Sequence, residues 1–216
     1  MACKCSLYER GQTFQPFSSF VGNASKVVLV SFGTVTDSSL MPEHWKDSFV
    51  ELFRRNPDIN FIWKMDLDIE VPSNVLRVKW TPHNDLLANN KVVAFITHCG
   101  YNSIGESIAS ATPLLIVPLF GDQHRNSQIA TFRKFGVRVD KDRISAETLN
   151  RELQKLLHDP IIQNFTTSLH LSRGGQRSAV YPELGSTSAW CNSEVRRQFH
   201  PQPSPFRPRD SPSVLA

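Results

Sequence analysis

Apolar residues in this chain gather in short runs, and these alternate with longer stretches in which apolar positions recur at helical spacing. The runs are rich in valine and isoleucine, which is typical of strands buried on both faces of a sheet. We therefore expect strands at residues 27–32, 60–64, 75–79, 92–97, 114–118 and 136–140. The amphipathic stretches between the runs predict helices at residues 42–55, 103–111, 123–135 and 145–158, the last with Ser145 as its N-cap.

The alternation of strands and helices predicts an α/β fold built on a doubly wound parallel sheet. It extends over residues 26–165, which we expect to form one domain. Residues 1–25 are polar and weakly patterned, so we expect a leader with little structure. Residues 166–216 are expected to be a disordered tail, because residues 173–216 hold six prolines and seven serines and bury too little apolar surface to offset their ordering entropy. The abrupt change of composition there is equally compatible with an alternative splice end or a change of reading frame.

Composition and charge exclude several classes of protein. With 216 residues, 40% of them hydrophobic and 20% charged, the chain is long enough for one well-packed domain. Residues 173–216 supply +3 of the net charge of +4, so the main body is nearly neutral and lacks the basic surface that nucleic-acid binding requires. The four cysteines are too few and too irregularly spaced for a disulfide framework or a zinc site, and we expect free thiols.

Two features bear on membranes and on the cellular compartment. The apolar runs are much shorter than the ~20 residues that a membrane-spanning helix needs, so we expect no membrane span in this chain. Residues 1–11 lack the apolar segment of a secretory signal. The chain by itself is therefore expected to stay in the cytoplasm.

The strand at residues 92–97 is followed by His98, Gly100, Asn102 and Ser103, just ahead of a predicted helix. Ligands of open parallel sheets bind beyond the carboxyl ends of the strands, and the amides and dipole of a helix N-terminus favour an anion such as phosphate there. Gly100 would let the backbone approach the ligand, and His98 could donate a hydrogen bond. Ser103 and Glu106 also form a capping box, which many helices carry without a ligand, so both interpretations stay open.

Two further polar clusters follow neighbouring strands. Asp122 and Gln123 come after the strand at 114–118, where an aspartate is ordinarily a helix cap but could also bind sugar hydroxyls. Trp80 ends the strand at 75–79, where its ring could belong to the core or could stack on a flat base.

The three clusters, in this order and spacing, closely resemble the signature of the UDP-glycosyltransferases, the family that includes the UDP-glucuronosyltransferases and the plant secondary-product glycosyltransferases. His98 follows Trp80 by 18 positions, and Asn102 lies four positions further on. The resemblance extends from about Val27, through a loop at residues 30–34 that resembles the first loop of the family's donor domain, to Pro160. It implies the Rossmann-like C-terminal half of a GT-B glycosyltransferase, with UDP-glucuronate or UDP-glucose as co-substrate and no metal.

The resemblance also implies roles for individual residues. Trp80 would stack on the uracil, and Glu106 would accept hydrogen bonds from the ribose hydroxyls. Thr34, where serine is more usual, would reach the phosphates. His83 stands where the family usually has glutamine, which implies an altered nucleotide affinity.

Further implied roles concern the phosphates and the sugar. The diphosphate would be held by His98, Gly100, Asn102 and Ser103, and the hydroxyls of the transferred sugar by Asp122 and Gln123.

In the implied reaction, a small lipophilic acceptor attacks the anomeric carbon with inversion while UDP leaves. The family's general base, a histidine, lies in an N-terminal domain that we expect this chain to lack, so no catalytic residue is assigned. His44, the nearest upstream histidine, is expected to be structural. Asp66 and Asp68 form an Asp-x-Asp pair in a polar loop apart from the clusters and are not expected to bind metal.

The resemblance implies an endoplasmic reticulum location, although we expect this chain to lack the family's signal and membrane anchor. Three readings of the chain therefore stay open. In the first, the chain is a transferase, alone or with a complementing half. In the second, it is a catalytically incompetent donor-binding half that pairs with or modulates full-length relatives. In the third, it is a truncated product that does not fold stably because its docking face is exposed.

Overall fold

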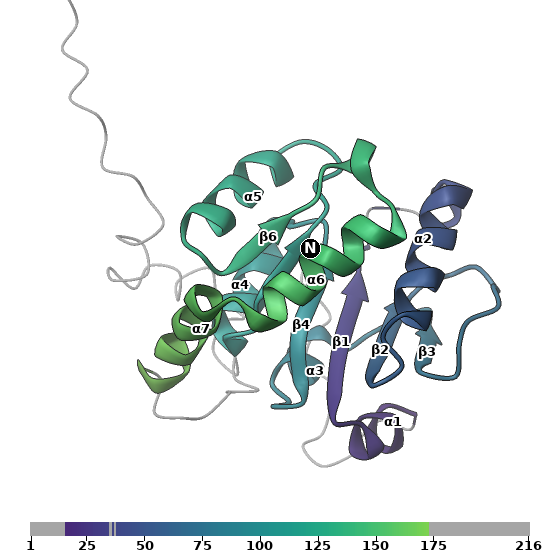
Figure 1. The fold of residues 1–216 in the computed structure, drawn as a ribbon, viewed down its shortest axis with the longest axis horizontal. Helices are drawn as coiled ribbons and strands as arrows, with labels where there is room; N and C mark the ends of the chain where they lie inside the picture. The colour runs from purple at the N-terminus through teal and green to yellow at the C-terminus, as the bar shows by residue number, and fades with distance from the viewer. Residues whose placement is uncertain (1–15, 35, 37, 173–216) are drawn as a thin grey trace, which may run out of the picture. The chain divides into compact units, whose positions relative to one another are not determined.

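The expected strands form one parallel sheet in the order β3-β2-β1-β4-β5-β6 (Figure 1). This computed structural model describes residues 16–34, 36 and 38–172. Within them the strands are β1 (Lys26–Ser31), β2 (Ile59–Lys64), β3 (Val75–Val78), β4 (Val92–Thr97), β5 (Leu114–Ile116) and β6 (Gly136–Arg138). The α-helices are α1 (Phe17–Asn23), α2 (Glu43–Arg54), α3 (His83–Leu87), α4 (Tyr101–Ser110), α5 (Gln123–Phe132), α6 (Ala146–His158) and α7 (Pro160–Ser172), with 3-10 turns η1 (Ser38–Leu40) and η2 (Lys141–Arg143).

The sheet is wound outward in both directions from its centre, as the sequence predicts. Every neighbouring pair of strands is parallel, and β1 pairs with both β2 and β4. At the centre, Leu29 lies opposite Ile62 of β2 and Phe95 of β4. The strand order therefore reverses between β1 and β4, which is the point at which such sheets bind their ligands.

Helices cover both faces of the sheet. In Figure 1, α2 and α6 lie across the near face, and α4 lies behind the sheet. On the near face, Phe49 and Phe53 of α2 pack on Trp63 of β2 with ring centroids 5.9 and 5.2 Å apart. All three side chains are fully buried. Aromatic packing of this kind holds α2 on the sheet and stabilises the part of the hydrophobic core between α2 and β2.

A buried asparagine joins α2 to α6. The Asn56 side chain donates to the Leu52 carbonyl (2.8 Å) and to Asn150 Oδ1 (2.9 Å), and its own Oδ1 accepts from Gln154 Nε2 (2.7 Å). Asn56 directly follows the C-cap of α2, and both partners in α6 lie almost a hundred residues away. This satisfied polar network sets the position of α6 across the sheet.

The expected N-cap of α6 is confirmed, because Ser145 Oγ accepts from the Thr148 backbone N–H at 3.1 Å.

Two expectations at the ends of the domain are wrong within the described residues. The expected leader contains the helix α1, which buries Phe17 and Val21 and whose last carbonyls accept from Lys91 Nζ. The expected tail begins inside α7, where Phe165 stacks on Phe135 with centroids 5.7 Å apart. Both segments owe their structure to tertiary contacts, which a weak local pattern does not reveal. Residues 173–216 lie outside the described residues.

The short helix α3 was also not expected from the sequence. It has five residues and follows Pro82, so its periodic signal is too short to detect.

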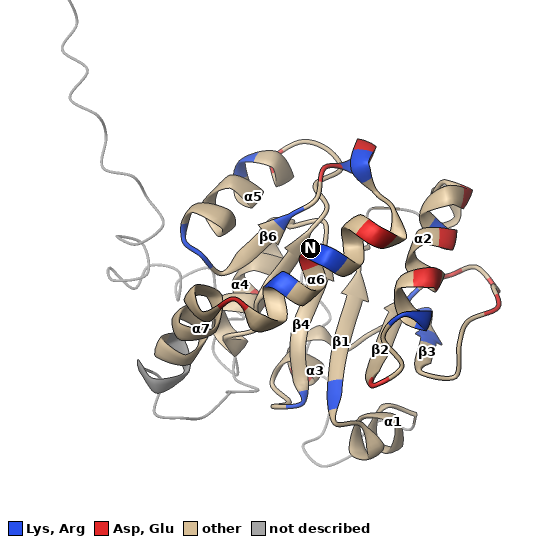
Figure 2. Cartoon of the chain, viewed as in Figure 1, with Lys and Arg blue, Asp and Glu red and all other residues tan. Residues whose placement is uncertain are grey.

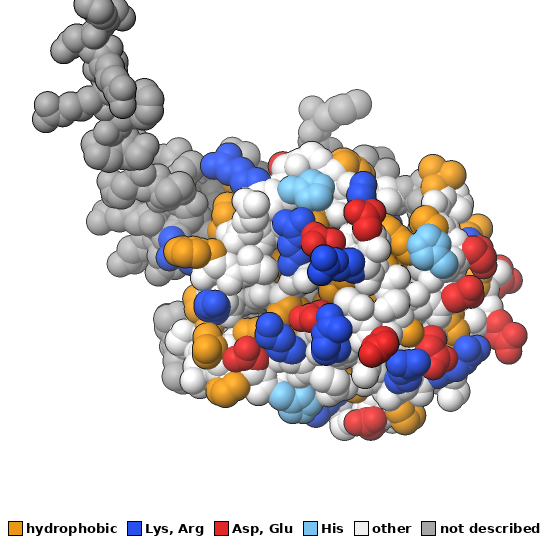
Figure 3. All heavy atoms as spheres, turned by 45° about the horizontal axis from the view of Figure 1, so that its top comes forward, with side chains coloured by type: hydrophobic (Ala, Val, Ile, Leu, Met, Phe, Trp, Pro, Cys, Tyr) orange, Lys and Arg blue, Asp and Glu red, His pale blue; other side chains and the backbone are white. Residues whose placement is uncertain are grey.

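Acidic and basic residues are interspersed along the helices and loops of the described chain (Figure 2). The face in Figure 3 shows the same mixture, with single apolar side chains between the charges. In the part of the chain that the structure describes, no helix combines the length and the apolar character needed to cross a bilayer.

We expect Asn56→Ala to lower the free energy of unfolding by about 2–3 kcal/mol, because it leaves Gln154 and Asn150 without their shared partner in a buried site. Chemical denaturation followed by circular dichroism measures the change. Asn150→Ala removes one contact and is the matched control, expected to cost about 1 kcal/mol. Equal stabilities of Asn56→Ala and wild type would contradict a structural role for the network.

Candidate functional site

His98 lies between two loops at the carboxyl edge of the sheet. A Cβ added to Gly33, in the loop after β1, would lie 2.7 Å from His98 Cε1, and one added to Gly100 would lie 2.7 Å from His98 Nε2. Gly33 also has a φ of +82°, which side chains other than glycine rarely adopt. The glycine backbone of each loop therefore packs directly on the imidazole, and His98 is held between the loop after β1 and the start of α4.

His98 is held in its neutral form. Burial lowers the pKa of His98 from 6.5 to about 4; the charge of Asp122 opposes this shift, and those of His83 and Lys64 add to it. The Lys64 ammonium lies close by, because its Nζ donates to the Gly33 carbonyl at 2.5 Å. At neutral pH the imidazole consequently offers one N–H donor and one acceptor nitrogen.

Cys99, between His98 and Gly100, has a φ of +66°. Burial, with the charge of Asp122, raises the pKa of this thiol to about 12, so it stays protonated. Cys99 is a free cysteine, as expected; the other three lie outside the described residues.

The helix that follows begins earlier than the sequence suggests. α4 starts at Tyr101, with Gly100 as its N-cap and no side-chain hydrogen bond to the cap. Ser103 is therefore inside the first turn and buried, so the capping-box interpretation of Ser103 and Glu106 is wrong. Amides of the first turn have no acceptor within the helix, and this N-terminus faces the edge of the sheet where His98 lies. Asn102 is exposed on the same turn.

A second network joins α4, α3 and β1. His83 Nδ1 lies 3.2 Å from Glu106 Oε2, and His83 Nε2 lies 3.0 Å from Ser31 Oγ. Ser31 in turn accepts from the Gly33 N–H at 3.3 Å. One carboxylate oxygen of Glu106 is thus tied through His83 to the loop that packs on His98. Trp80, three residues before His83, is 53% exposed.

Asp122 and Gln123 differ in their surroundings. Asp122 Oδ2 accepts from Asn126 Nδ2 at 2.9 Å, and the same nitrogen lies 3.2 Å from the Cys99 carbonyl, which links α5 to the loop before α4. Gln123 is buried, and its Oε1 accepts from the backbone N–H groups of Leu119 and Phe120. The structure therefore gives Gln123 a role in shaping its own loop, which its position in the sequence did not indicate.

The structure thus brings several of the expected residues to one edge of the sheet in two connected groups. His98, Gly100 and Asp122 form the first group, with Thr34 exposed next to Gly33. His83 and Glu106 form the second. Sequence reasoning missed the partners of these residues, which are Ser31, Lys64, Thr97 and Asn126, because strand ends and helix interiors carry no motif of their own.

The remaining candidates from the sequence are the Asp-x-Asp pair and His44. Asp68 forms an ion pair with Arg77, and Asp66 Oδ2 accepts from Ser38 Oγ at 2.8 Å. His44 is exposed on α2. Among the described residues, no three His, Cys, Asp or Glu side chains are grouped so that they could hold a metal ion.

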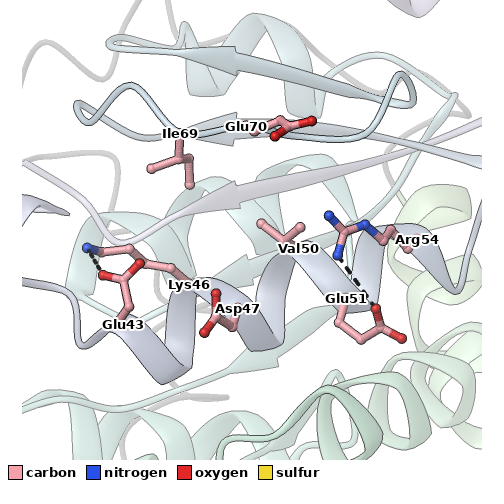
Figure 4. A pocket seen from close by; sticks show the side chains of 8 residues that line it. All are labelled: Glu43, Lys46, Asp47, Val50, Glu51, Arg54, Ile69 and Glu70. Carbon is pink, nitrogen blue, oxygen red and sulfur yellow. Dashed lines mark hydrogen bonds and ion pairs between the residues drawn. The ribbon is translucent and has the colours of Figure 1, made fainter.

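A pocket of about 440 Å³ lies between α2 and the loop that leads to β3 (Figure 4). Its charged walls are largely paired, with Lys46 on Glu43 at 2.8 Å and Arg54 on Glu51 at 3.9 Å. No expected site residue lines this pocket.

Residues 7–175 match the family described as UDP-glucoronosyl and UDP-glucosyl transferase. The chain belongs to the UDP-glycosyltransferase family. It is 45% identical over 190 residues to the putative UDP-glucuronosyltransferase ugt-55 of Caenorhabditis elegans, covering 82% of this chain and 37% of that protein. It is 34% identical over 170 residues to UDP-glucuronosyltransferase 3A1 of Bos taurus, covering 76% of this chain and 32% of that protein. This UDP-glycosyltransferase chain therefore spans about a third of the length of these curated relatives.

Solved structures confirm the fold of the UDP-glycosyltransferase chain. The crystal structure of Os79 from O. sativa in complex with UDP superposes with a TM-score of 0.62 at 22% identity, covering 86% of this chain and 43% of that one. Such neighbours are glycosyltransferases of the GT-B class, which agrees with the Rossmann-like fold expected from the sequence.

The neutral state of His98 predicts a pH dependence of stability. Between pH 6.5 and about 4 the unfolded chain binds a proton at this histidine and the folded chain does not, so the free energy of unfolding falls as the pH is lowered through this window. His98→Gln removes this contribution. From pH 7 to pH 4 we expect the free energy of unfolding of wild type to fall by up to about 3 kcal/mol more than that of His98→Gln.

Urea unfolding of both proteins at several pH values measures this difference. A constant difference across the window would show that His98 titrates alike in the folded and unfolded chains. His44→Gln, at an exposed position on α2, is the control for a general histidine effect.

Proposed function

We propose that this chain binds the UDP part of a UDP-sugar, UDP-glucuronate or UDP-glucose, at the carboxyl edge of β1 and β4, for inverting transfer of the sugar to a small lipophilic acceptor. The observation that carries the proposal is the fixed, neutral His98 beside the N-terminus of α4, with bare glycine backbone on both sides of its ring. A site of this kind offers an anion the N–H of a neutral imidazole next to the free amides of a helix N-terminus.

The diphosphate is assigned to the first group of residues. Its charge meets the positive end of the α4 dipole, and the N–H of His98 donates to a phosphate oxygen. Asn102 and Ser103 supply their amides from the first turn, and Thr34 its hydroxyl from the loop after β1. Lys64 adds a positive charge close to this site.

The uridine is assigned to Trp80 and to the second group, His83 and Glu106. Trp80 is exposed enough to offer a ring face to the uracil, and such stacking is worth ~1–3 kcal/mol. Because His83 binds Oε2 of Glu106, Oε1 is the oxygen that we assign to a ribose hydroxyl. Os79, which shares this fold, has been solved in complex with UDP, which supports UDP as the ligand of this chain.

The sugar is assigned to Asp122, and Gln123 holds the loop that presents it. Negative charge grows on the departing UDP as the acceptor attacks, so donors already aimed at the diphosphate stabilise the transition state more than the ground state. We assign no general base for the acceptor to this chain.

Calorimetric titration of the full chain with UDP tests the proposal. We expect binding in the micromolar range, and about 5- to 150-fold weaker binding for Trp80→Ala and for Glu106→Ala, because each loses a direct contact with the nucleotide. His44→Gln is the matched control and is expected to bind like wild type. Absence of UDP binding by a chain that circular dichroism shows to be folded would overturn the proposal.

The contact between His83 and Glu106 generates a second prediction. His83→Ala frees the Glu106 carboxylate to rotate, so we expect the preference for UDP over 2′-deoxy-UDP to fall by about fivefold to tenfold. His83→Gln keeps a donor for Glu106 and should retain the preference. The ratio of the two dissociation constants is the measurement, and an equal loss for both nucleotides would assign His83 to folding alone.

A further inference from the structure

Thr97, the last residue of β4, is fully buried beside His98. Its Oγ1 lies 3.3 Å from His98 Nδ1. Thr97 lies in the central strand of the sheet, opposite Ser31 of β1 and Ile116 of β5, so its position is fixed on both sides. Neither the family match nor the expected site gives this hydroxyl a role.

The hydrogen of the Thr97 hydroxyl needs an acceptor, because a buried hydroxyl that does not donate costs free energy. Within the described part of the chain, His98 Nδ1 is the hydrogen-bond partner that the structure shows for Oγ1. A neutral imidazole has one N–H and one bare nitrogen. When Nδ1 accepts from Thr97, the ring proton must be on Nε2.

The other ring nitrogen faces the proposed phosphate site. A Cβ on Gly100 would lie 2.7 Å from Nε2, which places this nitrogen against the N-cap of α4. A proton on Nε2 is thus carried next to the N-terminus of α4, where the first-turn amides begin. The opposite tautomer would present a lone pair there and would repel an anion.

Charged neighbours do not supply an alternative partner for Nδ1 in the described structure. Asp122 acts on His98 through its charge, while its Oδ2 is bound by Asn126. His83 and Lys64 also act on His98 through their charges. The His83 ring is bound to Ser31 and Glu106, and the Lys64 ammonium to the Gly33 carbonyl. The low pKa of His98, about 4, keeps the ring in the neutral form in which a choice of tautomer exists.

From this geometry we infer that Thr97 is a positioning residue, which fixes His98 in the tautomer protonated on Nε2 and so makes the imidazole a donor to the diphosphate of a nucleotide. The part that concerns the ligand rests on the proposed function, whereas the tautomer is a property of the free protein. Thr97 itself is not expected to contact the nucleotide.

The tautomer is measured directly by long-range ¹H–¹⁵N NMR of the full chain labelled with ¹⁵N-histidine, with His98 assigned by comparison with His98→Gln. We expect the Nε2-protonated pattern in wild type and in Thr97→Ser, which keeps the hydroxyl. Thr97→Val has the same shape without the hydroxyl, and we expect a mixture of tautomers. An Nδ1-protonated wild type, or an unchanged pattern in Thr97→Val, would overturn the inference.

Binding gives the second readout. Thr97→Val should bind UDP about tenfold more weakly than wild type and should bind uridine, which lacks phosphates, equally well. Thr97→Ser should restore UDP binding. An equal loss for UDP and uridine would show that Thr97 supports the fold rather than the donor. If the tautomer is as expected but wild type does not bind UDP, the proposed function fails and the assignment of the tautomer stands.

Discussion

The structure depends on the burial of both faces of its two central strands. Side chains on β1 alternate between the two faces, and Val27, Val28, Leu29 and Val30 are all fully buried. A strand of this kind is stable only between two layers of helices, so the chain must cross over on both sides of the sheet. The reversal between β1 and β4 follows from this requirement, and it gathers the loops after these strands at one edge.

At that edge, steric contact rather than charge fixes the key side chain. His98 is confined by the backbone of Gly33 and Gly100, and the burial that follows keeps it neutral. A neutral donor suits the proposed diphosphate site beside a helix N-terminus, because it needs no counter-ion when no ligand is bound. The same confinement makes the choice of tautomer depend on a single hydroxyl, that of Thr97.

His83 connects two elements of the site. Histidine reaches both Glu106 and Ser31 through its two nitrogens, so it ties the carboxylate on α4 to the end of β1. A histidine at the position where the resemblance implies glutamine therefore forms a polar bridge between these two elements. Gln123 differs from the expectation that it faces the sugar, because its side-chain oxygen accepts hydrogen bonds within its own loop.

The sequence by itself determined the parallel sheet, its strands and its longer helices, because burial on both faces leaves apolar runs and amphipathic helices leave a regular period. It also predicted which clusters form the candidate site, since residues such as His98 and Trp80 follow strand ends. The tertiary structure decided the extent of the domain, in which α1 and α7 are stabilised by contacts such as Lys91 on α1 and Phe165 on Phe135. It also decided where α4 begins. The neighbours of His98 were decided by the tertiary structure alone, because they come from separate strands and loops, and the local sequence does not show which strand ends lie close together.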